Sequence, residues 1–205
     1  MEKIQPFKTA AEAIDSLDNG GRFYNIFTHS HDQKISEAEV SKVAGLFFEK
    51  QKAMLFLEMA MDKLDASAKA EVVGRFDDNL KAGYEKFKPV VLSPAEALNG
   101  PDAANVIIRG TPKSVHSDTY LTGFILVPVV NVFTLIPVSE YYDAYEIRDE
   151  VSGEVIVLAA ARDKERLPET HIIMGGVLKT PDANEEGRAP GKRFLEVSYY
   201  VEEML

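Results

Sequence analysis

The chain contains no cysteine. Disulfide bonds, thiolate metal sites and a cysteine nucleophile are therefore excluded, and the absence fits a reducing compartment. The first ten residues, MEKIQPFKTA, lack the apolar core of a secretion signal, so we expect a cytoplasmic protein. The sequence also has no Gly-x-Ser-x-Gly nucleophile elbow, no phosphate-binding glycine loop and no dinucleotide fingerprint. These absences favour a protein that is not an enzyme and needs no cofactor.

An excess of positive charge is absent as well. The 205 residues include 23 basic and 33 acidic side chains, which give a formal net charge of −10. The mean field of such a chain repels phosphate, so that binding of nucleic acid would need a local basic patch. A protein partner or self-association is therefore the expected interaction, and charge disfavours nucleic acid.

The first part of the chain, residues 1–100, has the pattern of a helical region. Apolar residues recur at three- and four-residue spacing from Ser36 to Leu64, which predicts one long helix with a polar interruption. A second stripe, from Val73 to Phe87, predicts a further helix. Three expected helices begin with a capping box, in which a hydroxyl residue precedes a glutamate by three positions. The pairs are Thr9 with Glu12, Ser36 with Glu39, and Ser93 with Glu96.

The second part, residues 101–205, has the period of strands. The segments NVIIRG, YYDAYEIRDEVSGEVIVLAAA, HIIMGGVLK and RFLEVSYYVEEM predict strands. Ser152-Gly153 predicts the turn of a hairpin, and Gly175-Gly176 a bulge or a sharp bend. The last segment alternates, so that one set of side chains is expected on a common face. This set is Leu195, Val197, Tyr199 and Val201.

This series of strands resembles the OB fold, a small five-stranded barrel. A glycine stands within the first strand segment, VIIRGTPKSVH, as in that family. Ile147, Asp149, Gly153 and Val155 match the family's hairpin pattern, I-x-D-x-x-x-G-x-V. The resemblance covers most of the second part and leaves the helical region unexplained. It implies an antiparallel OB-like β-barrel for residues 101–205. Together with the N-terminal helical region, this gives a predicted α+β fold class.

The OB resemblance also implies a possible binding face. OB-type barrels bind single strands through aromatic and cationic side chains on their second and third strands and in the loops. Arg109, Tyr142 and Arg148 are the candidates, and Tyr145 has the opposite parity and is expected in the core. Acidic neighbours crowd the same hairpin and would repel phosphate.

A long apolar insert, residues 119–139, separates the first two expected strands and contains no charged residue. Its length would permit a membrane helix, but Pro128, Pro137 and the β-branched residues favour strands. Two buried or edge strands are the favoured interpretation. A surface for self-association or a partner, contacted through Phe124 and Phe133, is the next, since an exposed apolar patch of this size is unusual on a monomer. Membrane contact is disfavoured.

The stretch FTHSHDQKISEAEV, residues 27–40, is the part of the sequence that most resembles a catalytic or metal-binding motif. Its His-x-His pair resembles the ligand motif of metallo-β-lactamase-like hydrolases, but Gln33 and Lys34 stand where further ligands belong, and the chain has four histidines only. As a calcium loop it lacks the first aspartate and the glycine of the turn. The capping box at Ser36 explains the stretch as the start of a helix. His29, His31 and Asp32 are left as loop residues and as the candidates for a metal.

We therefore predict a non-catalytic binding or assembly module that contacts a protein or small ligand, through the long helix or the apolar insert. Single-stranded nucleic-acid binding by an OB-type surface is the alternative. A metal-dependent hydrolase is the third possibility.

Overall fold

The computed structural model describes residues 2–18, 32–46, 49–115, 120–121, 124–129, 132–137, 142–161, 166–180 and 193–203. The chain divides into two compact units. The helical unit is Ile4–Pro89, and the β unit combines Met1–Lys3 with Val90–Leu205. The fold class is α+β, as the sequence predicts. The segment that contains Ser93 belongs to the β unit, whereas the sequence pattern assigned residues up to 100 to the helical region.

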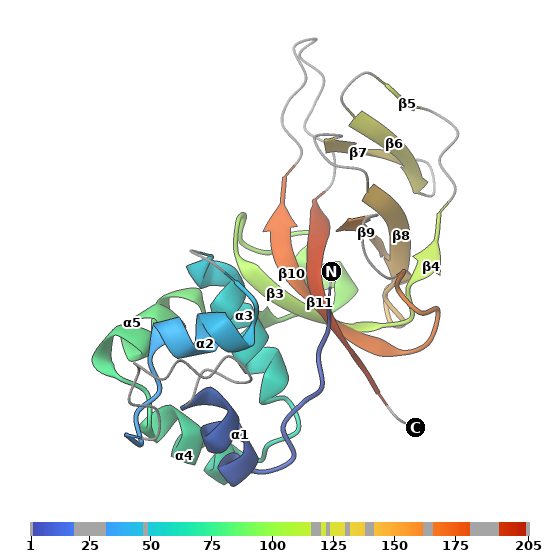
Figure 1. The fold of residues 1–205 in the computed structure, drawn as a ribbon. Helices are drawn as coiled ribbons and strands as arrows, with labels where there is room; N and C mark the ends of the chain where they lie inside the picture. The colour runs from blue at the N-terminus through green and yellow to red at the C-terminus, as the bar shows by residue number, and fades with distance from the viewer. Residues whose placement is uncertain are drawn as a thin grey trace. The chain divides into compact units, whose positions relative to one another are not determined.

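The helical unit contains five helices in its described residues (Figure 1). They are α1 (Ala10–Leu17), α2 (Glu37–Val43), α3 (Lys50–Ala60), α4 (Ala66–Gly74) and α5 (Asp78–Phe87). The capping box of Ser36 and Glu39 is confirmed at the start of α2. Thr9 caps α1 by accepting from the N–H of Glu12, but the Glu12 carboxylate accepts from the N–H of Lys8. Asp65 and Asp77 cap α4 and α5 in the same way as Thr9.

The long helix expected from Ser36 to Leu64 is wrong, because α2 and α3 are separate. Gly45, which follows the C-cap residue Ala44 of α2, has a φ of 67°, the left-handed conformation with which glycine ends helices. The stripe from Val73 to Phe87 is also divided between α4 and α5. Ile35 pairs there with Phe76, since the Ile35 N–H donates to Arg75 O and the Asp77 N–H donates to Ile35 O. A three- to four-residue period continues across such breaks and does not reveal them.

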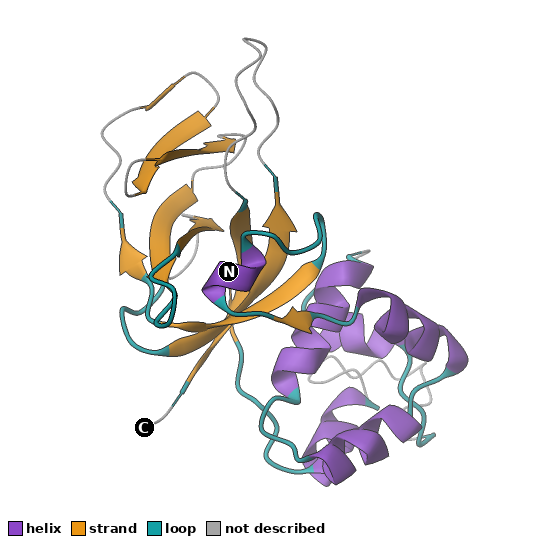
Figure 2. Ribbon diagram, turned by 180° about the vertical axis from the view of Figure 1, so that it is seen from behind, coloured by secondary structure: helices purple, strands orange, loops and turns teal. Residues whose placement is uncertain are grey.

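The described residues of the β unit form one large sheet and one small sheet (Figure 1). The strands of the large sheet are β1 (Glu2–Lys3), β2 (Val90–Val91), β3 (Asn105–Gly110), β4 (Lys113–Ser114), β8 (Tyr142–Arg148), β9 (Val155–Ala161), β10 (Ile172–Lys179) and β11 (Phe194–Glu202). Its order is β2-β3-β10-β11-β9-β8-β4, and β1 pairs with β11. The short helix α6 (Pro94–Ala97) lies among these strands and contacts β3 and β9 (Figure 2).

The pairing corrects the expectation of an antiparallel barrel. β9 with β11, β2 with β3 and β1 with β11 are parallel pairs, so the sheet is mixed. The path of pairings among the described strands runs from β2 to β4 and does not close on itself. The individual strands and the hairpin of β8 and β9 are where the sequence predicts them. Sequence period identifies strands, but not which strands become neighbours.

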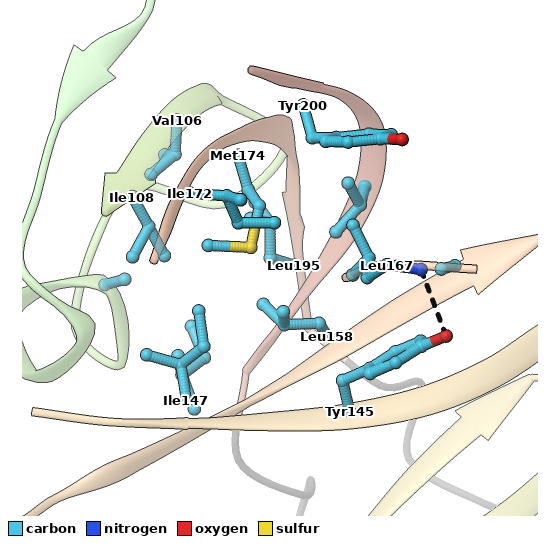
Figure 3. Packing of buried hydrophobic residues seen from close by; sticks show 14 of the residues in the cluster. Val106, Ile108, Tyr145, Ile147, Leu158, Leu167, Ile172, Met174, Leu195 and Tyr200 are labelled. Atoms are coloured by element: carbon cyan, nitrogen blue, oxygen red, sulfur yellow. Dashed lines mark hydrogen bonds between the residues drawn. The ribbon is translucent and has the colours of Figure 1, made fainter. Parts of the chain in front are cut away.

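The core of the β unit lies on one face of the large sheet. Figure 3 shows side chains from β3, β8, β9, β10 and β11 converging there, together with Leu167. Tyr145 is in this core, as predicted, and its hydroxyl oxygen accepts from the N–H of Leu167 at 3.2 Å. Burial of each large apolar side chain of this kind contributes about 1.5–3 kcal/mol.

The expected bulge at Gly175-Gly176 is confirmed, and it corrects the predicted face of β11. Gly175 pairs with Tyr199 but Gly176 pairs with Val197, so that Ser198 is the extra residue. The extra residue shifts the alternation by one position. Leu195 and Val197 therefore share the core with Tyr200 rather than with Tyr199.

The apolar insert forms the small sheet of β5 (Tyr120–Leu121), β6 (Phe124–Val129) and β7 (Val132–Pro137). β6 and β7 pair along their whole length, and β6 contacts β9 of the large sheet. The prediction of strands in the insert is thus confirmed for the backbone. Among the described residues, no helix is both long and apolar enough to cross a membrane.

Candidate binding groove of the β unit

A groove of about 660 Å³ runs over the β unit where four segments meet. One wall is the chain from β2 into α6, and another is the bend between β3 and β4. The turn between β8 and β9 and the residue before β10 complete it. Arg109 and Arg148, two of the binding residues predicted from the sequence, both line this groove.

Glu203 connects Arg109 and His171, two of the residues that line the groove. Its Oε1 pairs with Nη1 of Arg109, and its Oε2 lies 2.6 Å from Nδ1 of His171. Arg109 is at the end of β3 and His171 directly precedes β10, and these strands are paired. All three side chains remain accessible to solvent, with exposures between 32% and 43%. One carboxylate is thus held by two side chains of the groove wall.

The turn between β8 and β9 is fixed by Asp149. Its carboxylate accepts from the N–H groups of Val151 and Ser152, from the Ser152 hydroxyl, and from the N–H of Ala95 in α6. The hydrogen bond from the Ser152 N–H is the main cause that lowers the pKa of Asp149, and the other donors outweigh the opposing effect of desolvation. Gly153, with a φ of 74°, completes the turn. The Asp149 carboxylate therefore accepts four hydrogen bonds within the chain.

Two exposed valines give the groove apolar walls. Val91 of β2 is 63% exposed and Val151 of the turn is 98% exposed, and both line it. A large apolar side chain at the tip of a turn gains nothing from burial within the chain itself. These residues were not predicted, although Val151 between Glu150 and Ser152 was a usable signal, because polar residues and glycine are the usual occupants of turns.

The charges of the groove are mixed. Lys113 joins the arginines on its wall, and sequence analysis did not single out this lysine or His171 as a binding residue. Glu146 and Glu150 also line the groove. Glu96, also there, accepts from the N–H of Ser93 in the capping box of α6. The groove therefore has no excess of one sign over its whole length, which is not the pattern of a phosphate-binding channel.

Tyr142, the third OB-type candidate, lies apart from the groove. It is 8% exposed, its hydroxyl donates to Oε1 of Glu196 at 3.4 Å, and it packs in a second apolar cluster. This cluster occupies the face of β8 and β9 opposite to the core. Its members are Tyr142, Ala144, Val155, Val157, Ala159 and Phe194. Small buried apolar side chains on this face leave little aromatic surface on which a base could stack.

Four other predicted residues lie wholly or in their side chains outside what the structure describes. The side chains of Phe124 and Phe133 are among them, although their strands are described. His29 and His31 are in a segment that is not described, so that Asp32 is the one metal candidate within the described residues. In the described part of the chain, no cluster of three or more acidic or histidine side chains could hold a metal ion.

The helical unit has a hollow of its own and a buried polar cluster. The hollow, about 990 Å³, lies between α2 and α5, and Lys50 on its wall pairs with Glu37 at 3.1 Å. In the cluster, Glu58 of α3 accepts from the Tyr84 hydroxyl and from Lys69. Burial raises the pKa of Glu58, but these two partners outweigh it and lower the pKa. Burial and the bond to Glu58 raise the pKa of Tyr84.

No protein-family model matches the chain, and no curated protein matches it in sequence. Among solved structures it is similar to the N-terminal domain of an archaeal MCM, with 15% sequence identity over 83% of this chain and 86% of that chain. The TM-score of this match is 0.35. A similarity at this level establishes neither a common function nor a common site.

Proposed function

We propose that the protein is a non-catalytic binding module whose β unit holds a segment of another protein in the groove between β2, the β3–β4 bend and the β8–β9 turn. The single observation that carries the proposal is the pair of exposed valines, Val91 and Val151, on the walls of a polar groove. Apolar anchors surrounded by polar side chains are typical of protein interfaces.

We also infer an OB-type arrangement for this unit. Only Thr111 and Pro112 separate β3, which pairs with β10, from β4, which pairs with β8. If the two are halves of one strand bent at Gly110, the two ends of the large sheet are joined by that strand. Five long strands then form the partly open barrel that is characteristic of the OB fold.

Single-stranded nucleic acid is the second candidate ligand, and one observation favours it. Arg109, Lys113 and Arg148 all lie on the same groove. Against it stand the carboxylates of that groove and the buried apolar face of β8 and β9. Since nucleic-acid binding depends on neutralising phosphates, we consider the protein ligand the better supported of the two.

A selection of random decapeptides on the immobilised full chain tests the proposal. Peptides enriched on the wild type should lose binding to Val151→Asp, a change that is compatible with folding because this side chain is almost fully exposed. Glu154→Gln, in the same turn, is the matched control and should retain them. In parallel, anisotropy of a labelled dT20 oligonucleotide is measured at 50 and 200 mM salt. Salt-sensitive oligonucleotide binding without any enriched peptide would overturn the proposal.

A further inference from the structure

The contact of Glu203 with Arg109 and His171 indicates which chemical group the groove accepts. Arg109 and His171 line the groove, and one carboxylate from the C-terminal end of the described chain lies between them. A guanidinium and an imidazole nitrogen that converge on one carboxylate form a binding position for that group. The occupant in this structure belongs to the chain itself.

We propose that the groove binds an extended acidic segment of a partner protein, and that a carboxylate of this segment replaces Glu203 between Arg109 and His171. The inference rests on the proposed function, and it adds the chemistry of the partner. It also gives Glu203 a role, because the glutamate then competes with the ligand for the same two side chains.

The groove is lined by four acidic and three basic side chains, so its overall charge does not attract an acidic ligand. The attraction is local to Arg109, which already holds the carboxylate of Glu203, and two of the four acidic side chains are engaged within the chain. Asp149 accepts four hydrogen bonds within the chain, and Glu96 is engaged in the capping box of α6. Lys113 and Arg148 are the other basic side chains that line the groove. The Arg148 guanidinium donates one hydrogen bond to Gly153 O at 2.9 Å. Several further donors of a guanidinium can serve an incoming carboxylate.

The apolar walls determine which side chains of the ligand must accompany its acidic residues. Val91 and Val151 are the most exposed large apolar side chains among the described residues, and both face the groove. An apolar side chain of the ligand that covers them removes apolar surface from water on both partners. A segment in which acidic and aliphatic residues alternate meets both requirements, since an extended chain directs successive side chains to opposite sides.

Displacement of Glu203 requires only a small change. The side chains of Arg109, His171 and Glu203 are 43%, 43% and 32% exposed. Ion pairs at this exposure contribute little to the stability of a fold, so a ligand carboxylate can replace one without unfolding its surroundings.

The experiment uses the full chain and three fluorescein-labelled probes: a decapeptide of alternating glutamate and valine, its counterpart with glutamine for glutamate, and a dT10 oligonucleotide. Anisotropy titrations compare the wild type with Arg109→Gln, Glu203→Gln and Arg166→Gln. Arg166 is the matched control, because it is 84% exposed and lies outside the groove.

We expect the acidic peptide to bind the wild type and the glutamine peptide to bind much more weakly. Arg109→Gln should reduce the affinity about threefold to fivefold, because an ion pair of a partly exposed guanidinium is lost. Glu203→Gln should increase it about threefold, because the internal competitor is removed. Arg166→Gln should leave it unchanged. Arg166→Gln changes the net charge by the same amount as Arg109→Gln at a position outside the groove, and it therefore shows how large a general effect of charge is.

The outcomes separate this inference from the proposed function. Equal affinity for the two peptides, or an acidic-peptide affinity that Glu203→Gln does not raise, overturns the inference while the groove can still be a protein-binding site. Failure of both peptides to bind also overturns it, and the decapeptide selection then decides the proposed function independently. Binding of dT10 alone overturns the inference, and it contradicts the proposed function as well if the selection enriches no peptide.

Discussion

Gly110 lies directly against Ile147: a Cβ placed on this glycine would be 3.0 Å from Cγ2 of Ile147. The φ of Gly110 is 156°, a backbone conformation that other residues rarely adopt. The glycine is the last residue of β3, and β4 begins three positions later beside β8, the strand of Ile147. Both the conformation and the close approach explain why glycine stands where the chain passes from one side of the large sheet to the other.

Gly110→Ala should therefore destabilise the β unit. Close packing against Ile147 and an unfavourable φ together predict a loss of about 1–3 kcal/mol in the free energy of unfolding. Urea denaturation followed by far-UV circular dichroism measures the change. The cost should be smaller in an Ile147→Ala background, which removes the group that the new methyl would meet. Equal costs in the two backgrounds would show that packing against Ile147 is not the reason.

Gly176→Ala should be more severe, because the obstacle is backbone. A Cβ at this position would be 2.2 Å from the carbonyl oxygen of Glu196. Since β10 and β11 are paired at this bulge, the clash is relieved only by separating the strands. We expect a loss of at least ~3 kcal/mol or failure to fold, seen as a lower urea midpoint or insoluble protein.

Gly74→Ala is the matched control for that substitution. Gly74 is in α4, and a Cβ there has no neighbour within 4 Å. Alanine should stabilise the helix by about 0.5–1 kcal/mol, the opposite sign to Gly176→Ala. If both substitutions were neutral, the close approach of β10 to β11 at the bulge would be contradicted.

The sequence predicted the elements of the β unit better than their arrangement. Strand positions, the β8–β9 hairpin and the glycine bulge follow from local alternation and from glycine pairs, which act over a few residues. The parallel pairing of β9 with β11 depends on residues far apart in the chain, for which one sequence has no local signal. The core contains Tyr200 where the alternation predicted Tyr199. The reason is again a long-range one, because the residue at which a bulge shifts the alternation depends on the partner strand.

The sequence indicated only some of the residues that line the candidate groove. Arg109 and Arg148 were predicted because the resemblance to the OB fold implies binding residues on these strands. Val91 and His171 were not, because they meet the arginines only through the pairing of β2, β3 and β10. The break between α2 and α3 was missed because the hydrophobic period continues across it, although Gly45 could have indicated a helix end.

Asp149→Asn tests the hydrogen bonds that fix the wall of the groove. Those bonds lower the pKa of Asp149 below its ordinary value, so the folded state favours the carboxylate. The stabilisation is then fully present above the ordinary pKa, about 4, and is lost as pH falls through the lower pKa of the folded state. We expect a lower melting temperature for the variant at pH 7 and a smaller difference from the wild type near pH 3. Glu154→Gln, in the same turn, is the control. A difference that does not depend on pH would argue against an ionised Asp149 as the acceptor.

Tyr84→Phe tests the buried polar cluster of the helical unit. The substitution removes the hydroxyl that donates to Glu58 and leaves this half-buried carboxylate with Lys69 as its remaining hydrogen-bond donor. Hydrogen bonds to charged groups contribute about 1.5–3 kcal/mol, so we expect a loss in that range. Hydrogen–deuterium exchange should show faster exchange in α3 and α5, which carry the two residues, and unchanged exchange in β8–β11. Glu71→Gln on the exposed side of α4 is the control, and it should leave the exchange of both units as in the wild type. If Tyr84→Phe also left the exchange of α3 and α5 unchanged, the hydrogen bond would not contribute to holding these helices together.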